Sequence, residues 1–235
     1  MIKAIIFDLD NTLIDFITIK KNSVSAAVNA MRAAGLKLSQ QRAEKIMYSL
    51  YDRYGIEYGK IFQKFLSKIK GKIDYKILAA GVVAYRKIQT GILEPYPKVI
   101  PLLVKLKEKG LKLAVVSDAP RLKAWIRLTE LGIGDFFDTV VAYGDVREKK
   151  PSAVIFRKAI SKLGVKPSET LMVGDSLEKD IIGAKKIGMK TCFARYGLQT
   201  DRIGDYKRYK TKIRARADFT IDKLEELAKI IGVRL

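Results

Sequence analysis

The chain has 235 residues, of which 48% are hydrophobic and 30% are charged, and its formal net charge is +21 at pH 7. These proportions are typical of a globular protein with a sizeable core, and no apolar run approaches the roughly 18 residues of a membrane-spanning helix. The sequence has no histidine and a single cysteine, Cys192, which excludes histidine-dependent catalytic triads and any disulfide within the chain.

The large positive charge indicates a surface that attracts anions, which fits small phosphorylated metabolites as well as nucleic acids. The first residues lead directly into a strand without the pattern of a signal peptide, and a single cysteine suits a reducing compartment. We therefore expect a cytoplasmic protein without a membrane partner. Abundant lysine and glutamate together with scarce asparagine and glutamine favour a heat-adapted (thermophile) source.

Residues 3–7, "KAIIF", form a short apolar run that predicts a buried strand. Between about residue 20 and residue 90 the apolar residues instead recur at helical spacing in four segments, and Asp74 stands where the last of them needs an N-cap. Four amphipathic helices in succession predict a small bundle. Residues 16–92 carry fifteen Lys or Arg and four Asp or Glu, which could attract a phosphorylated substrate or simply form a solvated face.

From Pro95 onward, strand-like and helix-like segments alternate, with strands predicted at "KLAVVS", "DTVVAY", "TLMVG", "KTCFA" and "DFTI". This alternation predicts an α/β fold, in which a Rossmann-like parallel sheet carries helices on both faces. The helical segment is then an insertion, so that an α/β core domain comprises residues 1–15 and 93–235 and an α-helical bundle domain comprises residues 16–92. Trp125 is expected in the core.

Side chains that can carry chemistry follow four of the predicted strands at their carboxyl ends. In open α/β sheets this edge is where ligands bind. A role as helix N-cap would explain Asp118 or Ser152 singly, but it would not explain the whole set at one edge. The set consists of Asp8 and Asp10 after the first strand, Ser117 and Asp118 after the second, Lys149 and Lys150 after the third, and Asp175 and Asp180 after the fourth.

The candidate ligands at this edge are carboxylates, with no histidine or thiolate among them. Oxygen ligands favour a hard cation, so the site is expected to bind Mg²⁺ in preference to Zn²⁺. Two neighbouring carboxylates are costly unless a cation joins them or one keeps its proton. A metal ion that neutralises Asp8 and Asp175 together would remove that cost.

Four segments carry a family resemblance: "DLDNT" at 8–12, Ser117 at a strand end, Lys150 before a proline, and "GDSLEKD" at 174–180. Their order and spacing resemble the four motifs of the haloacid dehalogenase (HAD)-like hydrolase superfamily, and the resemblance runs through essentially the whole chain. The helical insertion resembles that superfamily's C1-type cap domain. Phrases such as "YDRYGIEYGK" and "SDAPRLKAWIRLTELGI" resemble an archaeal branch of glyceraldehyde 3-phosphate phosphatases.

The resemblance implies a role for each matching residue. Asp8 would attack phosphorus and form an aspartyl-phosphate, which divides hydrolysis into two easier steps, and Asp10 would act as general acid and then general base. The crowded carboxylates would favour a proton on Asp10. Phosphoryl oxygens would be held by Asn11, Thr12, Ser117 and Lys150, and the metal by Asp8, Asp175 and the Asp10 backbone carbonyl, with Asp180 either ligating it or orienting its waters or Lys150.

Asp118 departs from the family pattern, which often has Asn after the hydroxyl residue. A carboxylate cannot donate a hydrogen bond to phosphate, so a phosphate contact from Asp118 is expected through its backbone N–H. For the lysine role, Lys150 is preferred because it lies directly before Pro151, and Lys149 is the alternative.

The resulting hypothesis is a Mg²⁺-dependent phosphatase acting on a small phosphorylated metabolite, with glyceraldehyde 3-phosphate and phosphoglycolate as candidates. The resemblance also allows a 2-haloacid dehalogenase, although that chemistry needs neither Asp10 nor a metal, or a phosphomutase. The basic segment 207–216, "KRYKTKIRAR", with Tyr206 and Tyr209, allows a nucleic-acid-binding patch as a minor alternative.

Overall fold

The computed structural model describes the backbone of residues 1–200, 202–203, 206–207 and 215–235, and the side chains of residues 1–198 and 215–235. The chain forms two compact units. The α/β unit contains Met1–Asp15, Glu94–Thr200 and the described C-terminal residues, and the helical unit contains Phe16–Leu93. Most of the basic segment considered for nucleic-acid binding lies outside the described residues.

The α/β unit is built on a six-stranded sheet in the order β3-β2-β1-β4-β5-β8, in which every neighbouring pair is parallel. The first strand lies inside the sheet, where Phe7 is in register with Val115 on one side and Val173 on the other. This confirms the predicted α/β class and parallel sheet. The strands are β1 (Ala4–Phe7), β2 (Lys112–Pro120), β3 (Thr139–Tyr143), β4 (Thr170–Gly174), β5 (Lys190–Ala194) and β8 (Phe219–Ile221).

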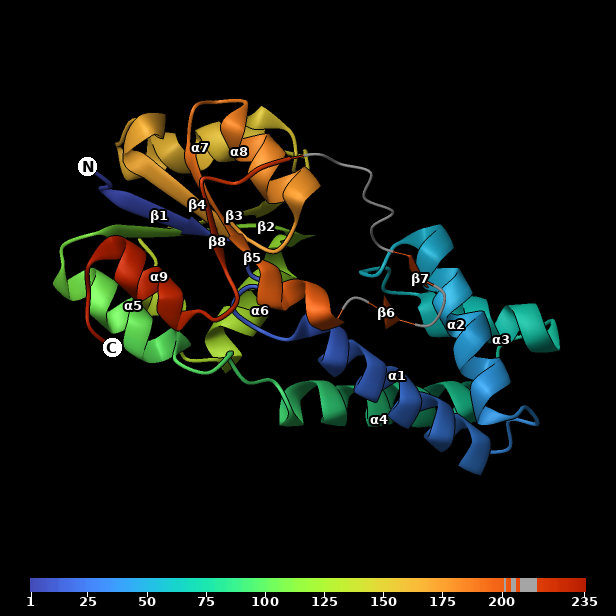
Figure 1. Cartoon of the computed structure of the whole chain (residues 1–235). Helices are drawn as coiled ribbons and strands as arrows, with labels where there is room; N and C mark the ends of the chain where they lie inside the picture. The colour runs from blue at the N-terminus through green and yellow to red at the C-terminus, as the bar shows by residue number, and fades with distance from the viewer. Residues whose placement is uncertain (201, 204–205, 208–214) are drawn as a thin grey trace. The chain divides into compact units, whose positions relative to one another are not determined.

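Helices cover both faces of this sheet. Figure 1 shows α7 and α8 on one face and α5 and α9 on the other, and right-handed connections place α6 on the same face as α5. Between β4 and β5 the chain forms a π-helical turn, Leu177–Ile182, followed by the short α8. The helices are α5 (Val99–Glu108), α6 (Arg121–Glu130), α7 (Ala153–Leu163), α8 (Gly183–Lys185) and α9 (Glu225–Ile231).

Three short 3₁₀ segments complete the described α/β unit, at Gly134–Phe136, Pro167–Glu169 and Arg195–Thr200. The single tryptophan lies on α6, and its position differs from the expectation that it would be in the core. Trp125 is 42% exposed, whereas Arg127 of the same helix is 4% exposed. Arg127 has a polar partner, described below, which accounts for the burial of the arginine and the exposure of the tryptophan.

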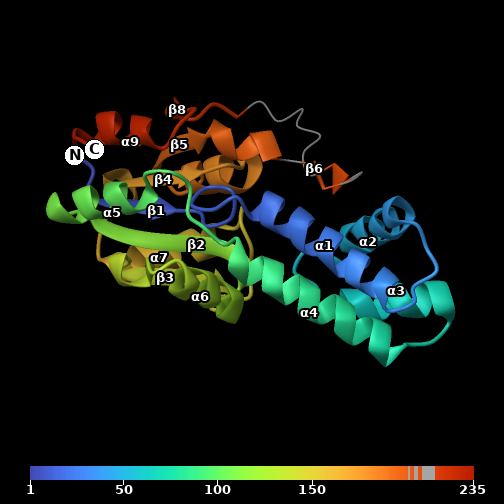
Figure 2. The same ribbon diagram turned by 90° about the horizontal axis from the view of Figure 1, so that it is seen from below.

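The helical unit contains four helices, as the apolar spacing predicted: α1 (Phe16–Ala33), α2 (Gln40–Tyr54), α3 (Ile61–Lys70) and α4 (Tyr75–Gly91). The side chain of Asp74 accepts a hydrogen bond of 3.2 Å from the Ile77 N–H, which confirms it as the N-cap of α4. Helices α1 and α4 run side by side (Figures 1 and 2), and Gly81 allows their close approach because a Cβ atom there would overlap Met31.

A two-residue antiparallel pair, β6 (Arg202–Ile203) and β7 (Tyr206–Lys207), follows the 3₁₀ segment that ends at Thr200. Among the helices that the structure describes, none combines the length and the apolar character needed to cross a bilayer.

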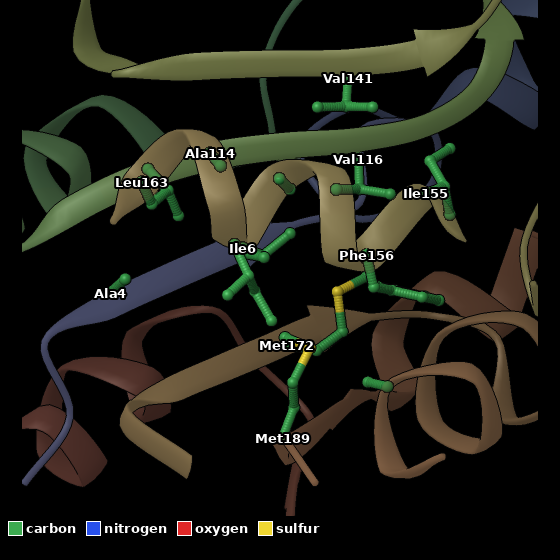
Figure 3. Packing of buried hydrophobic residues seen from close by; sticks show 13 residues of the cluster. Ala4, Ile6, Ala114, Val116, Val141, Ile155, Phe156, Leu163, Met172 and Met189 are labelled. Carbon is green, nitrogen blue, oxygen red and sulfur yellow. The ribbon is translucent and has the colours of Figure 1, made fainter. Parts of the chain in front are cut away.

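One layer of the hydrophobic core lies between the sheet and α7 (Figure 3). Ile6, Val116 and Met172 come from three adjacent strands, and their side chains meet Ile155 and Phe156 of α7. All five are fully buried. Because successive strand residues point to opposite faces, this face of the sheet carries alternate residues of each strand, and the remaining ones point to the face that α5, α6 and α9 cover.

We expect Phe156→Ala to lower the free energy of unfolding of the α/β unit by about 3–5 kcal/mol, since it removes a ring from a fully packed layer and leaves a cavity. Val154→Ala on the same helix is the matched control, because Val154 is 41% exposed and its truncation should cost about 0.5 kcal/mol or less. Urea unfolding followed by the fluorescence of Trp125, the only tryptophan, measures both. Equal losses in the two variants would contradict the packing described.

Candidate active site

Three carboxylates meet beyond the carboxyl ends of β1 and β4. Asp8 follows β1 directly, and its N–H donates a hydrogen bond of 2.9 Å to the carbonyl of Val173 in β4. Asp175 follows β4, and Asp180 lies on the π-helical turn after it. One carboxylate oxygen of each of these three aspartates lies within 4.8 Å of the others, and all three side chains are buried. We call Asp8, Asp175 and Asp180 the carboxylate cluster.

Lys150 supplies the positive charge that contacts this cluster. Its Nζ lies 2.6 Å from Oδ1 of Asp8 and 2.6 Å from Oδ1 of Asp180, and the residue is 4% exposed. Burial alone would lower the pKa of Lys150, but Asp180 and Asp8 outweigh it and hold the pKa well above its ordinary value. Lys149 instead lies over the ring of Tyr143, with Nζ 4.9 Å from the ring centroid. Of the two lysines considered from the sequence, the structure therefore brings Lys150 to the carboxylates.

Asp180 is held by two contacts and does not titrate normally. Its Oδ2 accepts a hydrogen bond of 2.9 Å from the Ser176 N–H, while its Oδ1 faces Lys150. Burial raises the pKa of Asp180 to about 6, against the lowering effect of Lys150 and with a further raising effect from Asp8. Gly174 is required beside it, because a Cβ atom there would lie 2.3 Å from Asp180 Oδ2.

The cluster fits a divalent cation. With all groups ionised, three carboxylates and one ammonium leave a formal charge of −2, which a divalent ion would neutralise. The available donors are carboxylate oxygens, the ligands that Mg²⁺ prefers. Asp10, also considered as a metal ligand, does not belong to this set of side-chain donors among the described residues. A ligand role for Asp10 would use its backbone carbonyl, as the sequence resemblance implied.

The turn after β1 and the end of β2 carry buried hydroxyl and amide side chains. Asn11 has φ 61°, a left-handed conformation that asparagine tolerates, and both Asn11 and Thr12 are fully buried. The Thr12 hydroxyl is a buried polar atom that makes no hydrogen bond to any described residue. Ser117 is also buried, and its Oγ accepts a hydrogen bond of 3.1 Å from the Ala119 N–H.

The segment after β5 approaches this turn closely. A Cβ atom at Gly197 would lie 2.2 Å from the Asn11 carbonyl oxygen and 2.5 Å from Cβ of Asp175, so a larger residue would displace one of them. The neighbouring Tyr196 donates a hydrogen bond of 2.8 Å to the carbonyl of Thr12. Neither residue was predicted from the sequence. The sequence feature that could have identified them is their position, because "RYG" directly follows the predicted strand "KTCFA" at the same edge of the sheet.

Asp118 connects three of the strand ends through its side chain. Oδ1 accepts a hydrogen bond of 2.8 Å from the Lys150 N–H, and Oδ2 lies 2.6 Å from Nζ of Lys179. Burial would raise the pKa of Asp118, but Lys150 and Lys179 outweigh it and keep the pKa below its ordinary value. One oxygen thus faces a backbone donor and the other a cation, and Lys179 is a further residue that the sequence did not single out.

Asp10 is paired with a residue that the sequence did not single out either. Nη1 of Arg127, on α6, lies 3.0 Å from Oδ1 and 2.9 Å from Oδ2 of Asp10. The sequence led to the expectation that crowding by other carboxylates would favour a proton on Asp10. The structure places the Arg127 guanidinium against both carboxylate oxygens, and the protonation state of Asp10 stays a prediction.

The chain is similar to known proteins along nearly its whole length. Residues 5–194 match the family model described as haloacid dehalogenase-like hydrolase. A glyceraldehyde 3-phosphate phosphatase of Methanocaldococcus jannaschii is 36% identical over 98% of this chain and 97% of its own. Another of the same name, from Methanopyrus kandleri, is 37% identical over 98% of this chain and 97% of its own.

A solved structure, the HAD phosphatase from Thermococcus onnurineus, is 28% identical and superimposes with a TM-score of 0.68, covering 100% of both chains. The family model spans β1 through β5, the strands whose carboxyl ends carry Asp8, Ser117, Lys150 and Asp175. The predicted family is therefore confirmed: the chain belongs to the haloacid dehalogenase-like hydrolases.

Proposed function

We propose that this hydrolase is a Mg²⁺-dependent phosphatase that cleaves a small phosphorylated metabolite through an aspartyl-phosphate on Asp8. The observation that carries the proposal is the carboxylate of Asp8 at the end of β1, 2.6 Å from the ammonium of Lys150 and grouped with Asp175 and Asp180. A nucleophilic carboxylate that must approach a phosphate dianion needs cations close by. Lys150 provides one cation beside Asp8, and the carboxylate cluster favours a second, the metal ion.

In the first step an oxygen of Asp8 attacks phosphorus, the ester bond from phosphorus to the substrate oxygen breaks, and Asp10 gives that oxygen a proton. In the second step a water attacks the same phosphorus, and Asp10 takes a proton from the water. The bond to Asp8 then breaks, and inorganic phosphate leaves. Since Asp10 must act once as acid and once as base, the placement of its carboxyl group governs both steps.

Asp8 and Asp175 would hold Mg²⁺ together with the backbone carbonyl of Asp10. Bound there, the ion would offset the charge of the phosphoryl oxygens during transfer. Asp180 contacts Lys150 at 2.6 Å and the Ser176 N–H at 2.9 Å, which supports a role in holding Lys150 at least as well as direct ligation of the metal.

The phosphoryl oxygens would be bound by Lys150, Ser117, Thr12 and the backbone N–H of Asn11. Support for this cradle comes from the buried Thr12 hydroxyl, which has no protein partner among the described residues and would otherwise remain unsatisfied. A phosphate oxygen beside it would accept its hydrogen bond. The backbone N–H of Asp118 is a further proposed contact, since its carboxylate serves Lys150 and Lys179.

Glyceraldehyde 3-phosphate is the first substrate to test. The two relatives reported above are named glyceraldehyde 3-phosphate phosphatase, and each matches this chain over 97% of its own length. The helical unit would act as the cap that selects the substrate. Phosphomutase activity remains an alternative, because an aspartyl-phosphate can also transfer its phosphoryl group to a sugar. A 2-haloacid dehalogenase is less favoured, since its chemistry has no use for Asp10 as acid or for a metal cluster. The cytoplasmic location stays a prediction.

The central test combines metal removal with Asp8→Asn. We expect the wild-type protein to hydrolyse glyceraldehyde 3-phosphate and p-nitrophenyl phosphate with Mg²⁺, to lose this activity in EDTA and to regain it when Mg²⁺ is restored. Asp8→Asn should lower kcat by about 10³-fold or more, because it removes the nucleophile. Asp135→Asn, at an exposed position of the same unit, is the control and should be unchanged. Metal-dependent hydrolysis retained by Asp8→Asn would rule out the proposal.

The role of Asp118 in holding Lys150 can be tested with two substitutions. Asp118→Ala leaves the N–H of Lys150 without its acceptor and should lower the free energy of unfolding by about 1–3 kcal/mol. Asp118→Asn keeps an acceptor oxygen for the Lys150 N–H and loses the charge that faces Lys179 and Lys150, so its loss should be smaller, about 1 kcal/mol. Urea unfolding measures both values. If the two variants lose the same stability, the hydrogen bond to Lys150 is not the important contact.

A further inference from the structure

Helix α6 is unusual because it buries a charge and exposes apolar side chains. Arg127 is 4% exposed and lies inward with Ala124 and Leu128, whereas Leu122 is 72% and Trp125 42% exposed. A buried guanidinium is costly unless it is paired and hydrogen-bonded. The orientation of α6 therefore needs an anionic partner on its inner side, and that partner is Asp10.

The contact is specific in its geometry. A single nitrogen of Arg127, Nη1, lies 3.0 Å from one carboxylate oxygen of Asp10 and 2.9 Å from the other. The side chains are only 5% and 15% exposed, so water screens the pair weakly. Contacts to both oxygens restrict rotation of the carboxylate, because turning it about its Cβ–Cγ bond would break at least one of them.

Asp10 needs such a restraint because of its neighbours. It lies two residues from Asp8, and a negative side chain there is attracted to Lys150 and to any cation held by the carboxylate cluster. If the Asp10 carboxylate moved to these charges, it would compete with Asp8 and leave the path of the leaving oxygen. Arg127 offers an alternative cation on the α6 side and so keeps the two carboxylates on different partners.

We propose that Arg127 is a positioning residue that aims the carboxyl group of Asp10 at the leaving-group oxygen and keeps it out of the carboxylate cluster. This inference rests on the proposed phosphatase function. The described contacts of Arg127 are with Asp10, through which it would act on the reaction. Its removal should therefore impair proton transfer more than it impairs phosphate binding.

The experiment compares two esters of nearly the same shape, p-nitrophenyl phosphate and phenyl phosphate. The nitrophenolate leaves without a proton more readily than phenolate does, so only phenyl phosphate depends strongly on the acid. A well-placed general acid contributes about 10²–10⁴-fold, and partial misplacement should forfeit part of that. We expect Arg127→Met to lower kcat/KM for phenyl phosphate about tenfold more than for p-nitrophenyl phosphate. Competitive inhibition by inorganic phosphate should change little.

Arg121→Met is the matched control, because Arg121 begins the same helix and pairs with Asp145 at a 55% exposed position. Its ratio of kcat/KM values for the two esters should equal that of the wild type. Arg127→Lys retains a charge but not the guanidinium geometry, so its ratio should change in the same direction by a smaller factor. It also serves as the deciding variant if Arg127→Met does not fold.

The inference would be overturned if folded Arg127→Met had the same ratio of kcat/KM values for the two esters as the wild type. An arginine with a purely structural role would affect both esters alike. The same holds for Arg127→Lys where Arg127→Met does not fold. Hydrolysis of neither ester by the wild-type protein would overturn the proposed function and the inference together. A changed ratio in Arg121→Met as large as that in Arg127→Met would also reject a specific role for the contact with Asp10.

Discussion

The ion contacts of Lys150 are the interaction on which the rest of the site depends. Its ammonium lies 2.6 Å from Asp8 and 2.6 Å from Asp180, and Asp175 shares their cluster. Removing one partner from a buried ion pair leaves an uncompensated charge and typically costs about 3–5 kcal/mol, so three buried carboxylates would not stay together without a cation. The contact that a phosphatase would use to receive a phosphate group is thus also the one that allows its carboxylates to gather.

The sheet order explains why these groups meet. The connections from β1 run to β2 and β3 on one side, and the chain then crosses to β4 on the other side of β1. Ligand sites in open α/β sheets lie at such a reversal, beyond the carboxyl ends of the strands. Because Phe7 and Val173 are in register, the residues that follow them, Asp8 and the segment leading to Asp175, emerge side by side. Lys150 then reaches them from the connection after β3.

The sequence was sufficient for the parts of this site that depend on local pattern. Strand-like runs with a carboxylate or hydroxyl at the carboxyl end identified Asp8, Ser117 and Asp175, since parallel strands bring such ends to one edge. It was insufficient for contacts set by three-dimensional packing. Arg127 lies 117 residues from Asp10, and a helical pattern with Trp125 beside an arginine indicates the opposite face as the buried one. The close approach of Gly197 depends on how the chain turns after β5.

Three acidic motif residues pair with cations from three different segments, whereas Asp180 shares Lys150 with Asp8. Asp8 contacts Lys150 from the connection after β3, Asp10 contacts Arg127 from α6, and Asp118 contacts Lys179 after β4. Because opposite charges at close range in a weakly screened interior attract strongly, sharing one cation would draw these carboxylates to the same point. Separate cations hold them apart. A carboxylate that must bond to phosphorus and one that must exchange a proton, only two residues away, can then act on different atoms of the same substrate.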